Sequence, residues 1–194
     1  MDGQGQDFKW IGKRTVRPDG VDKVTGRANF GADFSLPGML VGKVLRSTHP
    51  HARILSIDTE KAHALPGVKA VITAADLPDI PSEEAHFGED PTDFRHVSHN
   101  VMARDKALYD GHVVAAVAAT SESIADEALG LIEVNYEVLP HVLDVEEAMK
   151  PGAPLVLEDL ITGGVTPTPK DPSNIAKRVQ FDLGDTEAGF KKAN

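Results

Sequence analysis

The sequence predicts an α+β fold, in which helices pack on a mixed β-sheet and an extended C-terminal segment follows. Short apolar runs with the spacing of strands recur between residues 39 and 138, and a helical apolar pattern lies between the last two of them. After residue 149 the chain becomes rich in proline and glycine, which favours an extended connector over a second core.

The first half of the predicted domain has the order β-β-β-α-β. Residues 24–34 are interrupted by two glycines and predict an irregular strand, which a Pro-Gly turn ends. Residues 39–46 have apolar side chains on both faces, so we expect a strand buried on both sides, with Lys43 at an edge. After a polar turn at 47–51, the pattern predicts a strand, a short helix and a second strand, at residues 53–59, 60–65 and 68–73.

A different composition marks residues 75–104. This segment contains three prolines, many acidic residues and several histidines, and it has no sustained apolar period. We therefore expect a long surface loop, of the kind that is usually functional or forms an interface.

The second half of the domain is predicted to be a strand, a helix and a strand. Residues 112–120 contain a continuous run of small apolar side chains, which is typical of a central strand covered on both faces. Thr120 or Ser121 can cap the helix that follows, and residues 132–138 alternate as a half-buried strand. This unit should be right-handed if its strands are parallel. A short helix is expected at 144–149.

Composition excludes several classes of function. The net charge is −10, so nucleic acid or an anionic membrane would be repelled. The chain has no cysteine and cannot hold an iron–sulfur cluster or a Cys-based zinc site, so any redox centre must lie elsewhere. No apolar stretch approaches the roughly 20 residues of a membrane helix, and the start lacks a secretory signal, so we expect a cytoplasmic protein.

Histidines supply the first candidate sites. His86, His96 and His99 lie among acidic residues, namely Glu84, Glu89, Asp90 and Asp93, and could surround a divalent metal. A solvated acidic loop is the better interpretation, because an i, i+3 pair clips a metal chiefly on a helix and the prolines disfavour one nearby.

The His49-Pro50-His51 corner could be a pair of proton donors or ligands, but we interpret it as a structural corner whose imidazoles bond backbone or face a partner. Arg46 and Arg53 flank the corner and are expected to pair with carboxylates.

Other motifs do not support catalysis. Glu133 and Glu137 share one face of a strand and are expected to face water rather than act as an acid and base pair. The Gly38–Lys43 segment lacks the spacing and the hydroxyl of a phosphate loop. No G-x-G-x-x-G or G-x-S-x-G motif is present.

Five phrases of the sequence carry a family resemblance: GRANF at 26–30, PGML at 37–40, LRSTHPHARI at 45–54, YDGHVVA at 109–115 and VNYEVLP at 134–140. Together they resemble the front of the large, molybdopterin-binding subunits of the xanthine dehydrogenase and aldehyde oxidase family. The resemblance runs from Lys13 to about Glu147 and more loosely to the end. It implies an N-terminal arm at 1–21, an α/β-hammerhead domain at 22–148, and at 149–194 a connector and the start of the molybdopterin-binding region.

The resemblance also implies a function. The family hydroxylates heterocycles, aldehydes or aromatic thioesters with a molybdopterin–molybdenum cofactor, and passes electrons to 2Fe-2S clusters and FAD on partner domains or subunits. The hammerhead domain chiefly scaffolds and packs against these neighbours. The family's cofactor-facing loops and its glutamate base lie downstream, so no catalytic, cofactor-binding or metal residue is assigned, and the chain alone is expected to be inactive. A free-standing binding module and a small metalloenzyme using His86, His96 and His99 remain the alternatives.

Overall fold

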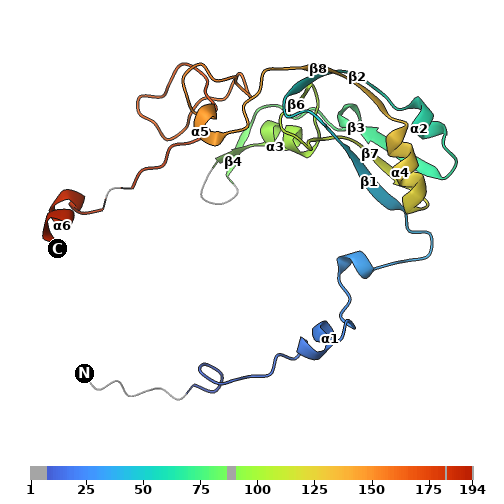
Figure 1. The fold of residues 1–194 in the computed structure, drawn as a ribbon, viewed down its shortest axis with the longest axis horizontal. Helices are drawn as coiled ribbons and strands as arrows, with labels where there is room; N and C mark the ends of the chain where they lie inside the picture. The colour runs from blue at the N-terminus through green and yellow to red at the C-terminus, as the bar shows by residue number, and fades with distance from the viewer. Residues whose placement is uncertain (1–7, 87–90, 182, 194) are drawn as a thin grey trace. The chain divides into compact units, whose positions relative to one another are not determined.

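The computed structural model describes residues 8–86, 91–181 and 183–193, and the side chains of 84–86 and 91–92 are not described. It divides into two compact units, residues 1–39 and 40–194 (Figure 1). In the described part of the first unit, α1 (Gly20–Val24) is followed by a single 3-10 turn (Gly31–Asp33).

The irregular strand expected at 24–34 is therefore wrong. Local side-chain bonds satisfy the backbone there without a partner strand: the Thr25 hydroxyl donates to the Val21 carbonyl, and the Asp33 carboxylate accepts from the Phe30 amide. Gly26 has a φ of +73°, a conformation that ends a helix and that glycine adopts without strain.

The second unit contains the sheets. Two sheets have three strands each and a third has two among the described residues, and every pairing between these strands is antiparallel. The first sheet has the order β1 (Val41–Arg46), β7 (Val113–Ala119), β3 (Val68–Thr73). The second has the order β6 (Lys106–Ala107), β2 (Ala52–Asp58), β8 (Glu133–Val138), and the third pairs β4 (Glu84–His86) with β5 (Pro91–Asp93). The predicted α+β class is confirmed.

The core forms where α4 (Glu122–Gly130) and α2 (Glu60–Ala64) pack on the first sheet (Figure 1). The central strand predicted at 112–120 is β7, whose small side chains let the helix approach closely. Ser121 caps α4 as expected, because its hydroxyl accepts the Ile124 amide. Gly67 has a φ of +98°, and a Cβ there would lie 2.7 Å from Ile124 Cδ1, so the turn before β3 packs tightly against α4.

Two expectations about this core are wrong. β1 was expected to be buried on both faces, but it is an edge strand with one covered face. The helix α4 packs on the face that carries Val41 and Leu45, whereas Val44 on the other face is 39% exposed. β7 and β8 do not form a unit within one sheet, because β1 and β3 occupy both edges of β7 and leave β8 to pair with β2. The handedness rule for parallel strands therefore does not apply here.

The segment at 75–104 contains regular structure and is not the loop that composition predicted. It holds a 3-10 turn (Ala74–Asp76), β4, β5 and the helix α3 (Phe94–Val101). The Asp93 carboxylate caps α3 by accepting the Arg95 amide, so the acidic residue after the last proline starts a helix.

After β8, the chain forms α5 (Val145–Ala148) and ends in α6 (Thr186–Lys192). Between them, residues 149–185 make one isolated bridge, from Gly163 to Lys177, and the described part has no helix or longer strand. None of the helices in the described ranges is long and apolar enough to cross a membrane.

Candidate functional site

The most developed polar site of the second unit is the place where residues 154–178 pack beside α3 and β6. A cleft of about 350 Å³ lies there. Its lining combines cationic, anionic and apolar side chains: Arg95, His96, His99, Arg104, Asp105, Lys106, Leu108, Leu157, Glu158 and Asp159. We call residues 154–178 the docked connector.

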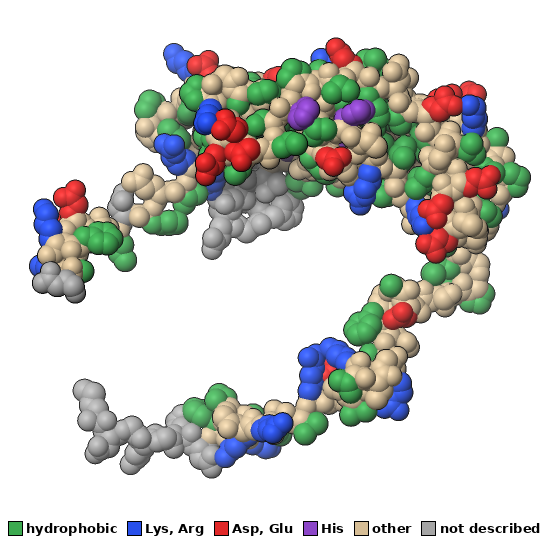
Figure 2. Space-filling view, viewed as in Figure 1, with side chains coloured by type: hydrophobic (Ala, Val, Ile, Leu, Met, Phe, Trp, Pro, Cys, Tyr) green, Lys and Arg blue, Asp and Glu red, His purple; other side chains and the backbone are tan. Residues whose placement is uncertain are grey.

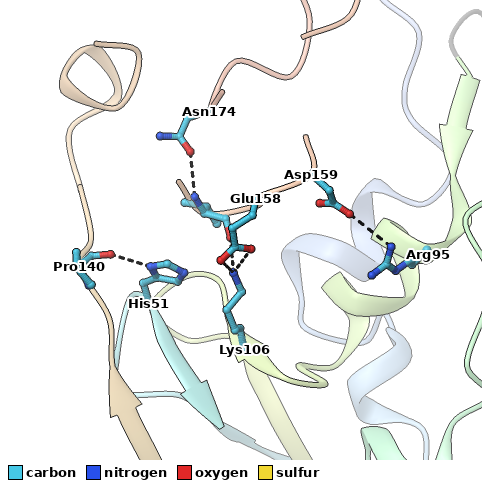
Figure 3. A network of polar contacts seen from close by, with 8 residues as sticks. His51, Arg95, Lys106, Pro140, Glu158, Asp159 and Asn174 are labelled. Carbon is cyan, nitrogen blue, oxygen red and sulfur yellow. Dashed lines mark hydrogen bonds and ion pairs between the residues drawn. The ribbon is translucent and has the colours of Figure 1, made fainter. Parts of the chain in front are cut away.

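Lys106 is the main anchor of the docked connector. Its ammonium donates to the Val156 carbonyl at 3.0 Å and to both carboxylate oxygens of Glu158 at 2.8 and 2.7 Å (Figure 3). The Lys106 side chain is only 15% exposed, whereas that of Glu158 is 69% exposed. The pKa of Glu158 lies below its ordinary value, chiefly because of the hydrogen bond from Lys106. The register Arg53↔Lys106 fixes this lysine at the edge of the second sheet.

A second ion pair joins the connector to α3. Arg95 lies 3.4 Å from the Asp159 carboxylate (Figure 3). The cap that starts α3 also positions Arg95, since Asp93 accepts its backbone amide. Adjacent acids of the connector therefore bind cations from two different elements of the domain.

Asn174 holds the connector in its folded shape. Its amide donates to the Ala148 carbonyl at 3.0 Å and to the Pro154 carbonyl at 2.9 Å, and its carbonyl oxygen accepts the Val156 amide at 3.0 Å. One side chain thus ties three separated backbone groups, so the segment predicted as extended is closed on itself.

The His-Pro-His corner lies next to this anchor. His51 is buried and donates from Nδ1 to the Pro140 carbonyl at 2.7 Å, as expected of a structural corner, while its Nε2 has no hydrogen-bond partner among the described residues. Its ring faces the Lys106–Glu158 pair (Figure 3). His49 packs edge-on against Tyr136, with 5.1 Å between ring centroids.

Of the two arginines that flank the corner, one pairs with a carboxylate as predicted and the other does not. Arg53 pairs with Glu137 at 2.9 Å, as predicted, but Arg46 donates to the Gly111 carbonyl and binds no carboxylate in any described contact. Glu133 and Glu137 do not pair with each other: Glu133 binds Lys61 and Glu137 binds Arg53. Both glutamates are exposed and face water as expected.

The metal hypothesis meets a mixed result. His96 and His99 lie on the helix α3, so the expectation that the nearby prolines disfavour a helix here is wrong. Both histidines line the cleft. However, no group of three His, Asp or Glu side chains gathers to hold a metal within the described residues. The side chain of His86 lies outside them.

The cations that line the cleft bind acceptors of the chain itself: Glu158 for Lys106, Asp159 for Arg95, and the Leu77 and Pro78 carbonyls for Arg104.

Sequence reasoning missed His112, a fully buried residue directly before β7. The Leu108 amide donates to its Nδ1 at 3.1 Å, which places the ring proton on Nε2, and Nε2 donates to the His99 carbonyl at 2.9 Å. The ring stacks on Tyr109 with 4.4 Å between centroids. Burial lowers the pKa of His112. Its position before an apolar run was visible, but its partners on α3 were not.

Comparisons with known proteins agree with this architecture. The family described as "Aldehyde oxidase and xanthine dehydrogenase, a/b hammerhead domain" matches residues 25–140. A probable xanthine dehydrogenase subunit of Bacillus subtilis is 40% identical over 92% of this chain and 21% of its own length. The carbon monoxide dehydrogenase large chain of Afipia carboxidovorans is 39% identical over 98% of this chain and 23% of its own.

Solved structures give the same result. Reconstituted CO dehydrogenase from Oligotropha carboxidovorans superposes with a TM-score of 0.68 at 38% identity, over 94% of this chain and 22% of that one. Quinoline 2-oxidoreductase from Pseudomonas putida 86 gives 0.59 at 36% identity, over 70% and 17%. The chain thus spans about a fifth of the length of the curated relatives that it matches. It belongs to the aldehyde oxidase and xanthine dehydrogenase family, of whose large subunits it contains the hammerhead domain.

Proposed function

We propose that this chain is the scaffold and assembly part of a molybdenum hydroxylase, and that it holds the segment leading into the cofactor-binding region in a fixed place. The observation that carries the proposal is the docked connector. Lys106 and Arg95 bind adjacent carboxylates of the connector, and Asn174 closes it. A loose linker would need none of these contacts.

The division of labour follows from this role. Residues 1–21 form an arm, 22–148 form the scaffold, and 149–194 form the connector and the start of the molybdopterin-binding region. The parent enzyme hydroxylates a heterocycle, an aldehyde or an aromatic thioester in the cytoplasm. Relatives named as a large molybdopterin subunit and as part of a dehydrogenase complex support a molybdenum cofactor downstream of this chain. Iron–sulfur and FAD subunits complete the assembly, and this chain alone is inactive.

The test is native mass spectrometry with metal and pterin analysis. The chain is purified alone, and again from cells that also produce the remaining molybdopterin-binding region and the iron–sulfur and FAD subunits. A cofactor-free chain that enters a larger, molybdenum-containing assembly is the expected result. Bound metal or turnover by the isolated chain would instead favour a small metalloenzyme, and failure to join the assembly would favour a free-standing binding module.

A paired variant tests the role of the connector. Arg95→Gln/Lys106→Met removes both anchors and should reduce the fraction of chain that assembles. Lys69→Gln/Lys150→Met removes the same charge from exposed positions outside the cleft and should not. Equal assembly by both double variants would contradict the role given to the docked connector.

A further inference from the structure

His112 joins the two elements that anchor the docked connector, α3 and β6. Its imidazole does not line the cleft, but both of its hydrogen-bond partners, the His99 carbonyl and the Leu108 amide, belong to residues that do. His99 lies in the last turn of α3, and Leu108 directly follows β6. One ring therefore bonds the helix that carries Arg95 and the end of the strand that carries Lys106.

The turn before β7 also holds the C-terminal end of α3. The carbonyls of the last helical residues have no partner inside a helix. Nε2 of His112 donates to the His99 carbonyl at 2.9 Å, and the Tyr109 hydroxyl donates to the Asn100 carbonyl at 3.2 Å. The two rings stack with 4.4 Å between centroids, so a movement of the imidazole disturbs both contacts.

The hydrogen bonds of the ring suit only its neutral form. Nδ1 accepts the Leu108 amide at 3.1 Å, so a proton added to Nδ1 would point at another N–H group. Figure 2 shows other histidine side chains at the surface of the second unit, where water can hydrate an added charge, whereas His112 is fully buried. Burial penalises the charged imidazole and lowers the pKa of His112.

The groups around the ring do not reverse this preference. His99 and Tyr109 are the titratable groups that face it, and a charged His99 lowers the pKa of His112 further. Arg46 donates to a carbonyl of the same turn, and Asp110 on that turn is exposed. Among the described contacts, no carboxylate bonds the ring. The carbonyls at the end of α3 favour a cation, but burial is the larger effect.

We propose that His112 is a proton-sensitive latch for the docked connector; this inference rests on the proposed function. The neutral ring holds α3 and β6 in the arrangement in which their two cations bind adjacent acids of the connector, and protonation of the ring releases both elements. Figure 3 shows these cations, Arg95 and Lys106, reaching Asp159 and Glu158.

The release follows from the geometry of the two hydrogen bonds. A protonated Nδ1 meets the Leu108 amide donor to donor, so the ring stays in place only if a donor loses its partner. When the ring leaves its site, the His99 carbonyl also loses its bond, and Tyr109 loses its stacking partner. A shift of either α3 or β6 then separates one cation from its acid, because the two acids are neighbours on one segment.

Amide hydrogen exchange of the full chain, read by mass spectrometry between about pH 7.5 and 5.5, tests the latch. Protection is expressed relative to the intrinsic exchange rate at each pH. We expect α3 and the connector to open together as the pH falls below 6.5, by up to about tenfold for each pH unit until the folded pKa of His112 is reached. Glu158 stays charged in this range, because its pKa lies below 4.5. The NMR signal of the His112 Cε1–H group reports when the ring is protonated.

Three variants separate the latch from other effects of pH. In His112→Gln, the amide can donate to the His99 carbonyl and accept from Leu108 without titrating, so the pH response of both segments should disappear. His63→Ala removes an exposed histidine and should keep the response. Arg95→Gln should leave the response of α3 intact, while the connector is less protected at every pH.

Each outcome decides the inference, and the wild-type measurements decide it even if His112→Gln does not fold. Protonation of His112 without loss of protection, or a ring that stays neutral down to about pH 5, would overturn the latch. Opening of α3 alone, equal loss of protection in α4 and β7, or a pH response that persists in His112→Gln would also overturn it. These outcomes leave the proposed function intact, because native mass spectrometry measures assembly separately. A connector without protection at about pH 7.5 would overturn both.

Discussion

Replacing His112 by alanine should destabilise the second unit by about 3–5 kcal/mol. The change leaves the partly buried Leu108 amide and His99 carbonyl without their partners, at about 1–3 kcal/mol each. It also removes the stack on Tyr109, which contributes about 0.5–1.5 kcal/mol. The sum of these ranges is about 2.5–7.5 kcal/mol, and its upper part does not apply because both hydrogen bonds are only partly buried.

The same residue should make stability depend on pH. Burial lowers the pKa of folded His112 below its value of 6.5 in the unfolded chain, so the unfolded state binds the proton more readily. The stability that neutral His112 provides is complete above pH 6.5, and it decreases as the pH falls from 6.5 through the lower folded pKa. Protonation would also break the hydrogen bond that Nδ1 accepts from Leu108.

Urea unfolding followed by far-UV circular dichroism is the suitable assay, because the only tryptophan, Trp10, lies in the first unit and does not report on this core. His112→Ala is measured beside His63→Ala, which removes an exposed histidine and should change stability by less than about 0.5 kcal/mol. A loss below about 1 kcal/mol for His112→Ala, or an unchanged pH profile between about 5 and 7, would refute the role assigned to this residue.

Three further predictions concern the connector and the core. Glu158→Gln should loosen the docked connector by less than about 1 kcal/mol, because the pair with Lys106 is partly exposed. Since Lys106 lowers the pKa of Glu158, docking of the wild-type connector should also weaken as the pH falls below about 4.5. Amide hydrogen exchange measures both effects. Asn174→Ala removes three hydrogen bonds and should open the connector by about 2–4 kcal/mol, seen as faster limited proteolysis; unchanged cleavage would count against the clamp. Gly67→Ala should destabilise the fold by about 1–3 kcal/mol in thermal unfolding, because its Cβ clashes at positive φ, whereas Gly130→Ala has open space and should be neutral or slightly stabilising.

Local patterns predicted the core elements well. The small apolar run of β7 and the Ser121 cap of α4 each depend on neighbours along the chain, and both occur as expected. The strand at 24–34 failed because no partner strand pairs with it among the described residues, and a strand without a partner is not stable. The helix α3 was missed because its cap, Asp93, was counted among the acids of a loop.

The site was harder to predict than the fold. Arg53 and the corner histidine His51 could be interpreted correctly from their neighbours, since a polar corner between strands needs local partners. Lys106, Glu158 and Asn174 gave no signal, because their contacts join residues that lie far apart in the sequence.

The sequence by itself determined the α+β class, the central strand β7 with the helix α4, and membership of the family, because periodicity, caps and motifs are local properties. Only the tertiary structure decided which strands share a sheet, because β1 and β3 fill both edges of β7 and force β8 onto β2. It also decided that the proline-rich tail is a docked connector. Hydrogen bonds and ion pairs between segments that are distant in the sequence form only when the tertiary fold brings those segments together, and local sequence patterns do not specify these contacts.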